Sequence, residues 1–337
     1  MTMPTHNRSP WRGPHVRRGR FYNPDTPKQN FSSFLRWVTQ RKPGPWEKFR
    51  KTDPGPRPPD RVEGDTLHVT FVNHSTFLLQ TMGLNLLTDP VWSERVSPVS
   101  FAGPRRHRAP GLNFEDLPPI DAILLSHNHY DHCDYATLRQ LAQRFAPAIF
   151  CPLGLQQALR KLGFERIHEL DWWQSTEWNG LQMHCVPAQH FSARGPFDRN
   201  RTLWCGWMMR STCGKIYFAG DTGFGGFFEE IAADFRNIRM ALLPIGAYEP
   251  EWFMGPIHMT PEQAVEAHRI LRPHMSIATH FGTFSLADDG EFAPLQRLHA
   301  KLATTPVATP FVVLREGESH TLQPATEAAA VSATTQD

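Results

Sequence analysis

Long hydrophobic runs are absent from this sequence of 337 residues. No apolar stretch approaches the roughly 20 residues that a membrane-spanning helix needs, and the basic segment 1–23 lacks the apolar stretch of a secretory signal. The five cysteines are odd in number and form no Cys-x-x-Cys pair, which predicts reduced and mostly buried thiols. We therefore expect a cytoplasmic protein, with association to a membrane surface left open.

A large net charge of one sign is also missing, because the formal charge is only +2. Residues 1–60 nevertheless hold 13 Lys and Arg against 4 Asp and Glu, together with eleven prolines. We interpret residues 1–60 as a basic, proline-rich extension, 61–322 as one catalytic domain and 323–337 as a disordered tail. The extension could be solvated, or it could contact an anionic membrane surface or nucleic acid. A short amphipathic helix expected near Phe31 would pack on the main domain or lie on a membrane.

The most informative segment runs from His127 to His132 and reads His-Asn-His-Tyr-Asp-His. In an extended chain, alternation places His127, His129 and Asp131 on one side. Imidazole and carboxylate groups together suit zinc, iron or manganese. A histidine-rich surface loop is the alternative, but four candidate ligands in six residues favour a metal site.

Three further candidate ligands, His190, Asp221 and His280, each follow a short apolar segment, as His127 does. Taken singly, each would more often be a structural histidine or a turn residue. Loops at strand ends are where a rigid scaffold presents functional groups, so we expect these ends to converge. The expected metal ligands are His127, His129, Asp131, His132, His190, Asp221 and His280.

Seven ligands suit two metal ions, and we expect two zinc ions per chain. His127, His129 and His190 would form one site, and Asp221 would bridge it to a second site formed by the other three ligands. Each metal would keep a position for water, as in catalytic zinc sites, where the metal makes water nucleophilic near neutral pH.

Local patterns predict mixed α and β structure. Short strand-like runs indicate strands over 67–72, 76–80 and 84–88, with Met82 and Gly83 as a turn between the last two. Asp134 can cap a helix, and Thr260 with Gln263 forms a capping-box start for a helix that ends near residue 272.

The motif His-x-His-x-Asp-His after an apolar strand, followed by separate His, Asp and His residues, resembles the metallo-β-lactamase superfamily over roughly residues 62–320. This resemblance implies an α/β fold, the αββα sandwich, in which two mixed β-sheets are flanked by helices. The metals would lie at one edge of the sheets.

A closer resemblance is to the N-acyl-phosphatidylethanolamine-hydrolysing phospholipase D family. The matching segments are 117–121, 126–132, 169–173, 218–223, 244–254 and 280–284. Members of that family are zinc phosphodiesterases that release an N-acylethanolamine and phosphatidic acid. The resemblance therefore implies a phospholipid substrate and catalytic roles for Asp131 and Asp221. The loops 73–76 and 190–194 depart from the family pattern.

The same resemblance implies roles around the metals. Asp89 would orient a metal-binding histidine, and His74 ends a predicted strand at the same edge. His258 would lie near the substrate and could protonate the leaving alkoxide or hold the phosphate. Tyr130 would contact substrate.

Large apolar side chains follow two of the candidate site segments. Trp252, Phe253 and Met254 are expected in a loop, and Phe224 follows Asp221 closely. These side chains could form a groove for acyl chains beside the metals, or they could pack in the core.

Two other functions remain open from the sequence. A zinc-dependent lactonase or soluble phosphodiesterase of the same superfamily would use the same metals on a different substrate. A membrane- or nucleic-acid-binding protein that uses the basic extension is weaker, because a binding module does not need seven metal ligands. We expect no nucleic-acid partner, and peripheral membrane contact, oligomeric state and metal identity in the cell are left open.

Overall fold

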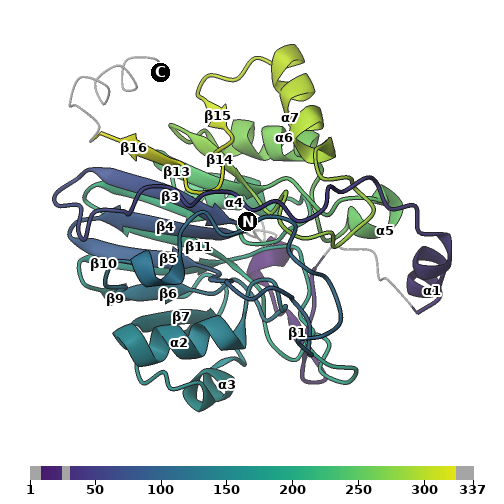
Figure 1. Cartoon of the computed structure of the whole chain (residues 1–337), viewed down its shortest axis with the longest axis horizontal. Helices are drawn as coiled ribbons and strands as arrows, with labels where there is room; N and C mark the ends of the chain where they lie inside the picture. The colour runs from purple at the N-terminus through teal and green to yellow at the C-terminus, as the bar shows by residue number, and fades with distance from the viewer. Residues whose placement is uncertain (1–8, 25–30, 324–337) are drawn as a thin grey trace, which may run out of the picture.

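The computed structural model describes residues 9–24 and 31–323. Its main body consists of two β-sheets that face each other, with helices on the outer side of each (Figure 1). This arrangement confirms the expected αββα sandwich. The predicted disordered tail lies, from residue 324 onward, outside the described residues.

Each sheet has seven strands among the described residues. The first sheet, in the order β16-β3-β4-β5-β6-β7-β8, contains β3 (Leu67–Asn73), β4 (Thr76–Thr81), β5 (Leu84–Thr88), β6 (Ala122–Leu124), β7 (Ala148–Pro152), β8 (Ile167–Leu170) and β16 (Ser319–Leu322). The second sheet, in the order β15-β14-β13-β12-β11-β10-β9, contains β9 (Ser175–Trp178), β10 (Leu181–Val186), β11 (Gly206–Ser211), β12 (Gly214–Phe218), β13 (Ile238–Pro244), β14 (Ser276–Thr279) and β15 (Phe311–Val312). The three predicted strands are β3, β4 and β5.

The two sheets share one internal plan, an antiparallel half followed by a parallel half. In the first sheet, β16, β3, β4 and β5 pair antiparallel, and β5 to β8 pair parallel. In the second sheet, β9 to β12 pair antiparallel, and β12 to β15 pair parallel. Strands β3, β5 and β6 consequently end at one edge of their sheet, and β10, β12 and β14 end at one edge of theirs.

Both faces of the first sheet are buried, which explains its nearly continuous apolar strands. Val69 and Phe71 of β3 point into the core between the sheets, whereas Val72 belongs to a second cluster under the helices. Leu78 and Leu87 join Val72 in this outer cluster, and all five side chains are fully buried. Each such side chain stabilises the fold by about 1.5–3 kcal/mol.

Helices cover the outer face of each sheet (Figure 1). They are α2 (Tyr135–Phe145) and α3 (Gln156–Lys161) on the first sheet, and α4 (Phe227–Asp234), α6 (Pro261–Leu271) and α7 (Ala293–Thr304) on the second. Both predicted helix starts are confirmed: Asp134 accepts a hydrogen bond from the backbone N–H of Ala136, and Thr260 and Gln263 form the capping box. A 3-10 turn, η2 (Phe114–Asp116), precedes β6. Among the described helices, none has the length and apolar character needed to cross a membrane.

The first described residues, 9–24, pack on the sandwich. They comprise η1 (Pro10–Arg12) and a hairpin of β1 (Val16–Arg17) and β2 (Arg20–Phe21). Trp11 is buried in the main hydrophobic core, where its ring contacts those of Trp172 and Phe227. This part of the basic extension is therefore integral to the folded body, and the predicted boundary at residue 60 stays a prediction.

The expected amphipathic helix is α1 (Phe31–Gln40), and it packs against the short helix α5 (Glu251–Met254). Trp37 stacks on Phe253 with ring centroids 5.1 Å apart. The expectation that residues 252–254 form a loop was wrong, because the backbone N–H groups of Phe253 and Met254 bond to the carbonyl of Pro250 and close a helical turn.

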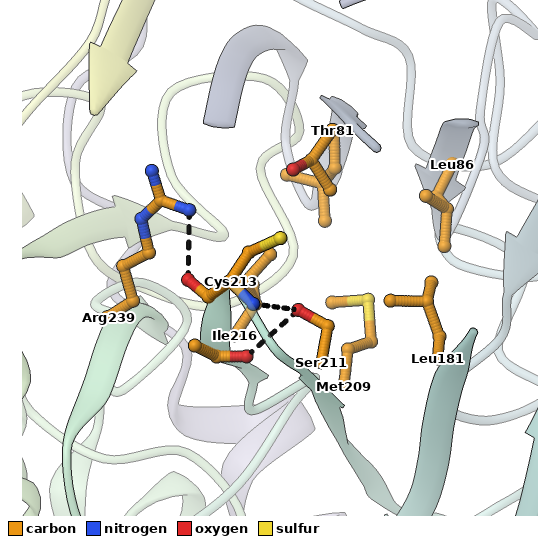
Figure 2. Close-up of a pocket in the computed structure, with 10 residues that line it drawn as sticks. Thr81, Leu86, Leu181, Met209, Ser211, Cys213, Ile216 and Arg239 are labelled. Atoms are coloured by element: carbon orange, nitrogen blue, oxygen red, sulfur yellow. Dashed lines mark hydrogen bonds between the residues drawn. The ribbon is translucent and has the colours of Figure 1, made fainter. Parts of the chain in front are cut away.

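The edge opposite the strand ends described above is closed by hairpin turns (Figure 2). Its cavity has a volume of only about 10 Å³. Arg239 donates a hydrogen bond to the carbonyl of Cys213 there, and the Cys213 N–H donates to Ser211. This cavity has no room for a substrate.

Candidate metal centre

The strand ends gather the predicted ligands at one edge of the sandwich. The segment 127–132 follows β6, His190 follows β10, Asp221 follows β12, and His280 follows β14. All seven predicted ligands except His129 are buried, and His129 is half-buried. The structure therefore brings together side chains that lie as much as 153 positions apart in the sequence.

Three histidines form the first group of donors. The Nε2 atom of His127 lies 2.8 Å from Nδ1 of His129, and Nε2 of His190 lies 3.2 Å from the same Nδ1. Nitrogen atoms this close can share one ion at the usual zinc–nitrogen distance of about 2.0–2.1 Å. His127, His129 and His190 thus form the three-histidine group that the sequence predicted.

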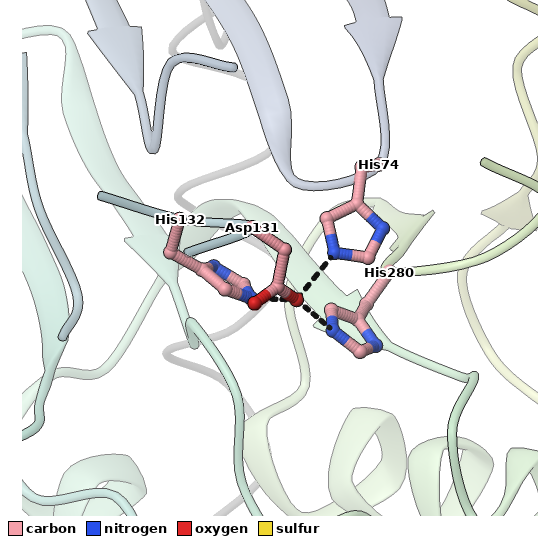
Figure 3. A group of neighbouring side chains, drawn as sticks. All are labelled: His74, Asp131, His132 and His280. Atoms are coloured by element: carbon pink, nitrogen blue, oxygen red, sulfur yellow. Dashed lines mark hydrogen bonds and ion pairs between the residues drawn. The ribbon is translucent and has the colours of Figure 1, made fainter. Parts of the chain in front are cut away.

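The second group centres on the Asp131 carboxylate (Figure 3). Its Oδ2 atom lies 3.2 Å from Nε2 of His132 and 3.5 Å from Nε2 of His280. The Nε2 atom of His74 approaches the same oxygen at 3.0 Å. His74 lies in the turn after β3, with a backbone φ of +48°, which turns its ring toward this group.

Asp221 lies between the two groups. Its Oδ2 atom is 3.1 Å from Nε2 of both His132 and His280. The same oxygen is 3.9 Å from Nε2 of His127 and 3.8 Å from Nε2 of His190. One carboxylate therefore faces both candidate sites, which is the geometry expected of a bridging ligand.

Asp89 sets the orientation of two histidines. Its Oδ2 atom is 2.6 Å from Nδ1 of His132, so that nitrogen carries the proton and Nε2 is left to face Asp131. Ser126 donates its hydroxyl proton to Asp89 and consequently accepts one from Nδ1 of His127. The ring of His190 is oriented by a similar contact. Its Nδ1 donates a hydrogen bond to the carbonyl of Ile257 at 2.8 Å, which leaves Nε2 to face the other ligands.

Burial and neighbouring charges shift the pKa values of the candidate ligands. Burial lowers the pKa of His129 to about 4 and that of His190 to about 3, so both rings are neutral at pH 7 and their bare nitrogens can bind a cation. Burial also opposes protonation of His280, but the Asp221 carboxylate raises its pKa to about 9. Burial would raise the pKa of Asp221, yet His132 and His280 hold it well below its ordinary value.

The donor set fits divalent metal ions. Buried polar atoms are nearly always hydrogen-bonded, but Oδ1 of Asp221 and Nδ1 of His258 have no hydrogen-bond partner among the described residues. Imidazole nitrogens and carboxylate oxygens without sulfur match zinc and related metals. Cys133, although adjacent to His132, is buried in the outer apolar cluster, and burial raises the pKa of its thiol to about 12. It belongs to none of the candidate metal groups in the described chain.

The predicted substrate residues occupy different positions. His258 is buried beside the ligands, with Nδ1 4.0 Å from Oδ2 of Asp221 and its ring stacked on His280. Tyr130 donates a hydrogen bond to the carbonyl of Arg194, whose guanidinium lies 4.0 Å from the centre of the tyrosine ring. Tyr130 thus braces the loop that follows His190.

The apolar residues that were predicted to contact substrate differ in how deeply they are buried. Trp252 is half exposed, whereas Phe253 and Met254 are buried in a small cluster that also contacts Trp37. Phe224 is partly buried and packs against the main core next to Phe228. Among these four residues, Trp252 has the most open surface for a ligand.

Sequence reasoning missed two features of the site. The first is Ser126, which connects Asp89 to His127; its only signal was its place directly before the metal motif. The second is Asn23, which donates a hydrogen bond to the carbonyl of His190 at 2.8 Å and so brings the first described segment to the metal centre. No local pattern marked Asn23, because its partner lies 167 residues away.

The chain was compared with known families, sequences and structures. The family description "Beta-lactamase superfamily domain" matches residues 84–281. An N-acyl-phosphatidylethanolamine-hydrolysing phospholipase D of Caenorhabditis elegans is 40% identical over 232 residues, covering 65% of each protein. An uncharacterised protein of Mycobacterium tuberculosis is 42% identical over 245 residues, covering 71% of this chain and 65% of its own length. The chain thus spans 65% of the length of these two relatives.

A solved structure with the same fold is Igni18, a metallo hydrolase from Ignicoccus hospitalis. It has a TM-score of 0.57 and 23% sequence identity, covering 77% of this chain and 99% of its own. At this identity the similarity establishes the fold alone.

Proposed function

We propose that this chain, which belongs to the beta-lactamase superfamily domain family, is a metal-dependent hydrolase of the N-acyl-phosphatidylethanolamine-hydrolysing phospholipase D-like branch. More specifically, we propose a binuclear zinc phosphodiesterase. Its substrates would be N-acyl-phosphatidylethanolamine-type phospholipids, and its products an N-acylethanolamine and phosphatidic acid.

The observation that carries this proposal is the position of Asp221. Its Oδ2 atom lies within 4.0 Å of ring nitrogens from both the three-histidine group and the group around Asp131. A carboxylate that faces two groups of donors supports two ions that share a bridging ligand. His127, His129 and His190 would hold one ion, and the remaining group would hold the other.

When bound, two zinc ions supply Lewis-acid stabilisation of the charge on the phosphoryl oxygens and an activated water for attack on phosphorus. The protein's own groups then have separate roles. Asp131 and Asp221 place negative charge between the two donor groups, and Asp89 keeps the His132 ring in the orientation that directs Nε2 inward. These fixed groups leave the nucleophile and the phosphorus little freedom of position.

His258 is proposed as the proton donor to the leaving oxygen. Its ring lies against His280 and its Nδ1 has no hydrogen-bond partner among the described residues, so this nitrogen is available to a substrate atom. In the reaction the P–O bond to the N-acylethanolamine breaks and water supplies the new oxygen on phosphorus. The proton that this water loses would pass through the His258 ring to the departing alkoxide, which leaves His258 unchanged at the end. Burial lowers the pKa of His258 well below its ordinary value, so the ring is neutral and free to take up that proton.

A comparison of substrates tests the proposal. Purified full-length protein loaded with zinc would be assayed in parallel on an N-acylated phosphatidylethanolamine, a lactone and a cyclic nucleotide, with products identified by mass spectrometry. We expect release of N-acylethanolamine and phosphatidic acid, at a rate lower by about 100-fold or more in an Asp221→Asn variant. Turnover confined to the lactone or the cyclic nucleotide would reject the lipid assignment and support the alternative of a lactonase or soluble phosphodiesterase.

A further inference from the structure

A solvent-open cavity of about 730 Å³ lies next to the metal centre. One part of its wall is His190, a candidate ligand, together with the neighbouring Phe191. Another part is the β1–β2 hairpin, which lies outside the residues that match the family. The cavity therefore joins the first described segment of this chain to the catalytic edge.

Four arginines line this cavity, namely Arg17, Arg18 and Arg20 of the hairpin and Arg199 of the facing loop. Within residues 9–24 and 31–323, none of the four forms an ion pair with a carboxylate. Like charges gathered without counter-charges repel one another, and an anionic ligand relieves this repulsion.

The hairpin is held firmly in place. Arg18 and Gly19 both have positive φ, at 52° and 70°, and make the tight two-residue turn that directs Arg17 and Arg20 to the same end. The backbone N–H of Phe21 donates to the carbonyl of Asn200 at 2.8 Å, and the Asn200 side chain donates back to the carbonyl of Phe21. The cavity wall is thus part of the fold and not a loose arm.

The same cavity also has an apolar side. Phe21, Tyr22, Phe191 and Ile257 contribute to the lining, and the guanidinium of Arg199 lies 4.2 Å from the centre of the Phe191 ring. A free inorganic anion would use only the arginines. A molecule with a charged head and a hydrocarbon chain would use both kinds of surface.

We propose that this cavity binds the phosphate group of an acyl-bearing lipid, with the arginines on the phosphate and the apolar wall on the chain. Guanidinium groups suit phosphate because their planar array of N–H donors matches its oxygens. Because the proposed function places the phosphate of the substrate at the metals, the lipid bound in this cavity is a separate anionic lipid, and its binding does not rest on the proposed function. The basic hairpin would then anchor that lipid beside the metals.

Direct binding measurements on the full-length, zinc-loaded protein test this proposal. The variant Arg17→Gln/Arg18→Gln/Arg199→Gln removes three of the charges, while Arg20 is kept because its guanidinium bonds to the carbonyls of Phe197 and Arg199. The matched control, Arg139→Gln/Arg160→Gln/Arg236→Gln, removes the same charge at exposed positions away from the cavity.

The probes are dihexanoyl phosphatidic acid, dihexanoyl phosphatidylcholine and inorganic phosphate, titrated at constant ionic strength. We expect the cavity variant to bind the phosphatidic acid about tenfold more weakly than wild type and the control variant to bind it like wild type. Equal affinity of the cavity and control variants for this lipid would overturn the proposal. If the cavity variant loses affinity for inorganic phosphate by the same factor as for phosphatidic acid, the lipid part of the proposal is overturned and the cavity is a site for free phosphate.

Zinc content and thermal unfolding of the same samples show whether a variant has lost only the arginine charges of the cavity or has failed to fold. If the triple variant is unstable, Arg17→Gln/Arg18→Gln replaces it, because both side chains are exposed on the hairpin. Hydrolysis of bis(4-nitrophenyl) phosphate by the wild-type protein reports on the metal centre separately. Its absence would count against the phosphodiesterase proposal, and the lipid-binding comparison would still decide the role of the cavity.

Discussion

Oδ2 of Asp89 lies 2.6 Å from Nδ1 of His132, and both side chains are completely buried. The Asp89 carboxylate keeps the proton on Nδ1 of His132. Burial would lower the pKa of that ring, but the charges of Asp221, Asp131 and Asp89 together raise it well above its ordinary value. The opposite ring nitrogen is directed at Asp131 and Asp221. The Asp89 carboxylate therefore determines how Nε2 of His132 is presented to the other ligands.

The first prediction concerns this contact. Asp89→Asn removes the charge that orients His132 and should weaken zinc binding by about 10- to 100-fold, as loss of such a partner does in other metal sites. Competition with a chromophoric zinc chelator measures the affinity. Asp60→Asn, at an exposed position, is the control and should match wild type. Unchanged zinc affinity in Asp89→Asn would show that packing alone holds the ring.

The second prediction concerns the shared carboxylate. Asp221→Asn should lower the zinc content from two ions toward one per chain and reduce phosphodiester hydrolysis by about 100-fold or more, because the bridging charge is lost. Elemental analysis of dialysed protein gives the zinc content, and Asp53→Asn serves as an exposed control. Two retained ions in Asp221→Asn would contradict the bridging role.

The third prediction separates His258 from the metal ligands. His258→Gln should retain both zinc ions and lower kcat by about 100-fold, with the largest loss for substrates whose leaving alkoxide needs a proton. His299→Gln, at an exposed position, provides the control. If zinc is lost instead, His258 is a ligand that acts together with His190 and Asp221, which lie close to it.

The fourth prediction concerns pH and the first described segment. Burial would lower the pKa of His15, but the hydrogen bond and charge of Asp171, at 2.7 Å, raise it above its ordinary value of 6.5. Stability from this pair is therefore fully present below pH 6.5 and is lost as the pH rises through the raised pKa.

Asp171→Asn should accordingly destabilise the protein by about 0.5–1 kcal/mol at pH 6 and by less at pH 9. Urea unfolding at the two pH values measures the difference, and tryptic cleavage after Arg17 and Arg18 reports on release of the hairpin. Asp116→Asn, whose carboxylate bonds to Asn113 and not to a histidine, should show no such pH dependence. An equal cost of Asp171→Asn at both pH values would mean that His15 stays neutral.

Much of the sandwich could be predicted because its signals are local. Short strand-like runs indicated β3, β4 and β5, and the helix starts at Asp134 and Thr260 follow from capping chemistry confined to a few neighbouring residues. The short helix at Trp252 escaped prediction, because it is a single turn after Pro250 with no periodic pattern to reveal it.

The sequence by itself determined the kind of site: a dense histidine and aspartate motif and three later ligands, each placed after an apolar strand. Such groups are recognisable because their chemistry and spacing are written in short segments. Only the tertiary structure decided that Ser126 and Asp89 share a proton network with two of these histidines, and that the basic hairpin forms a wall beside His190. These contacts join residues as much as 173 positions apart, and their geometry depends on how the two sheets and their loops pack.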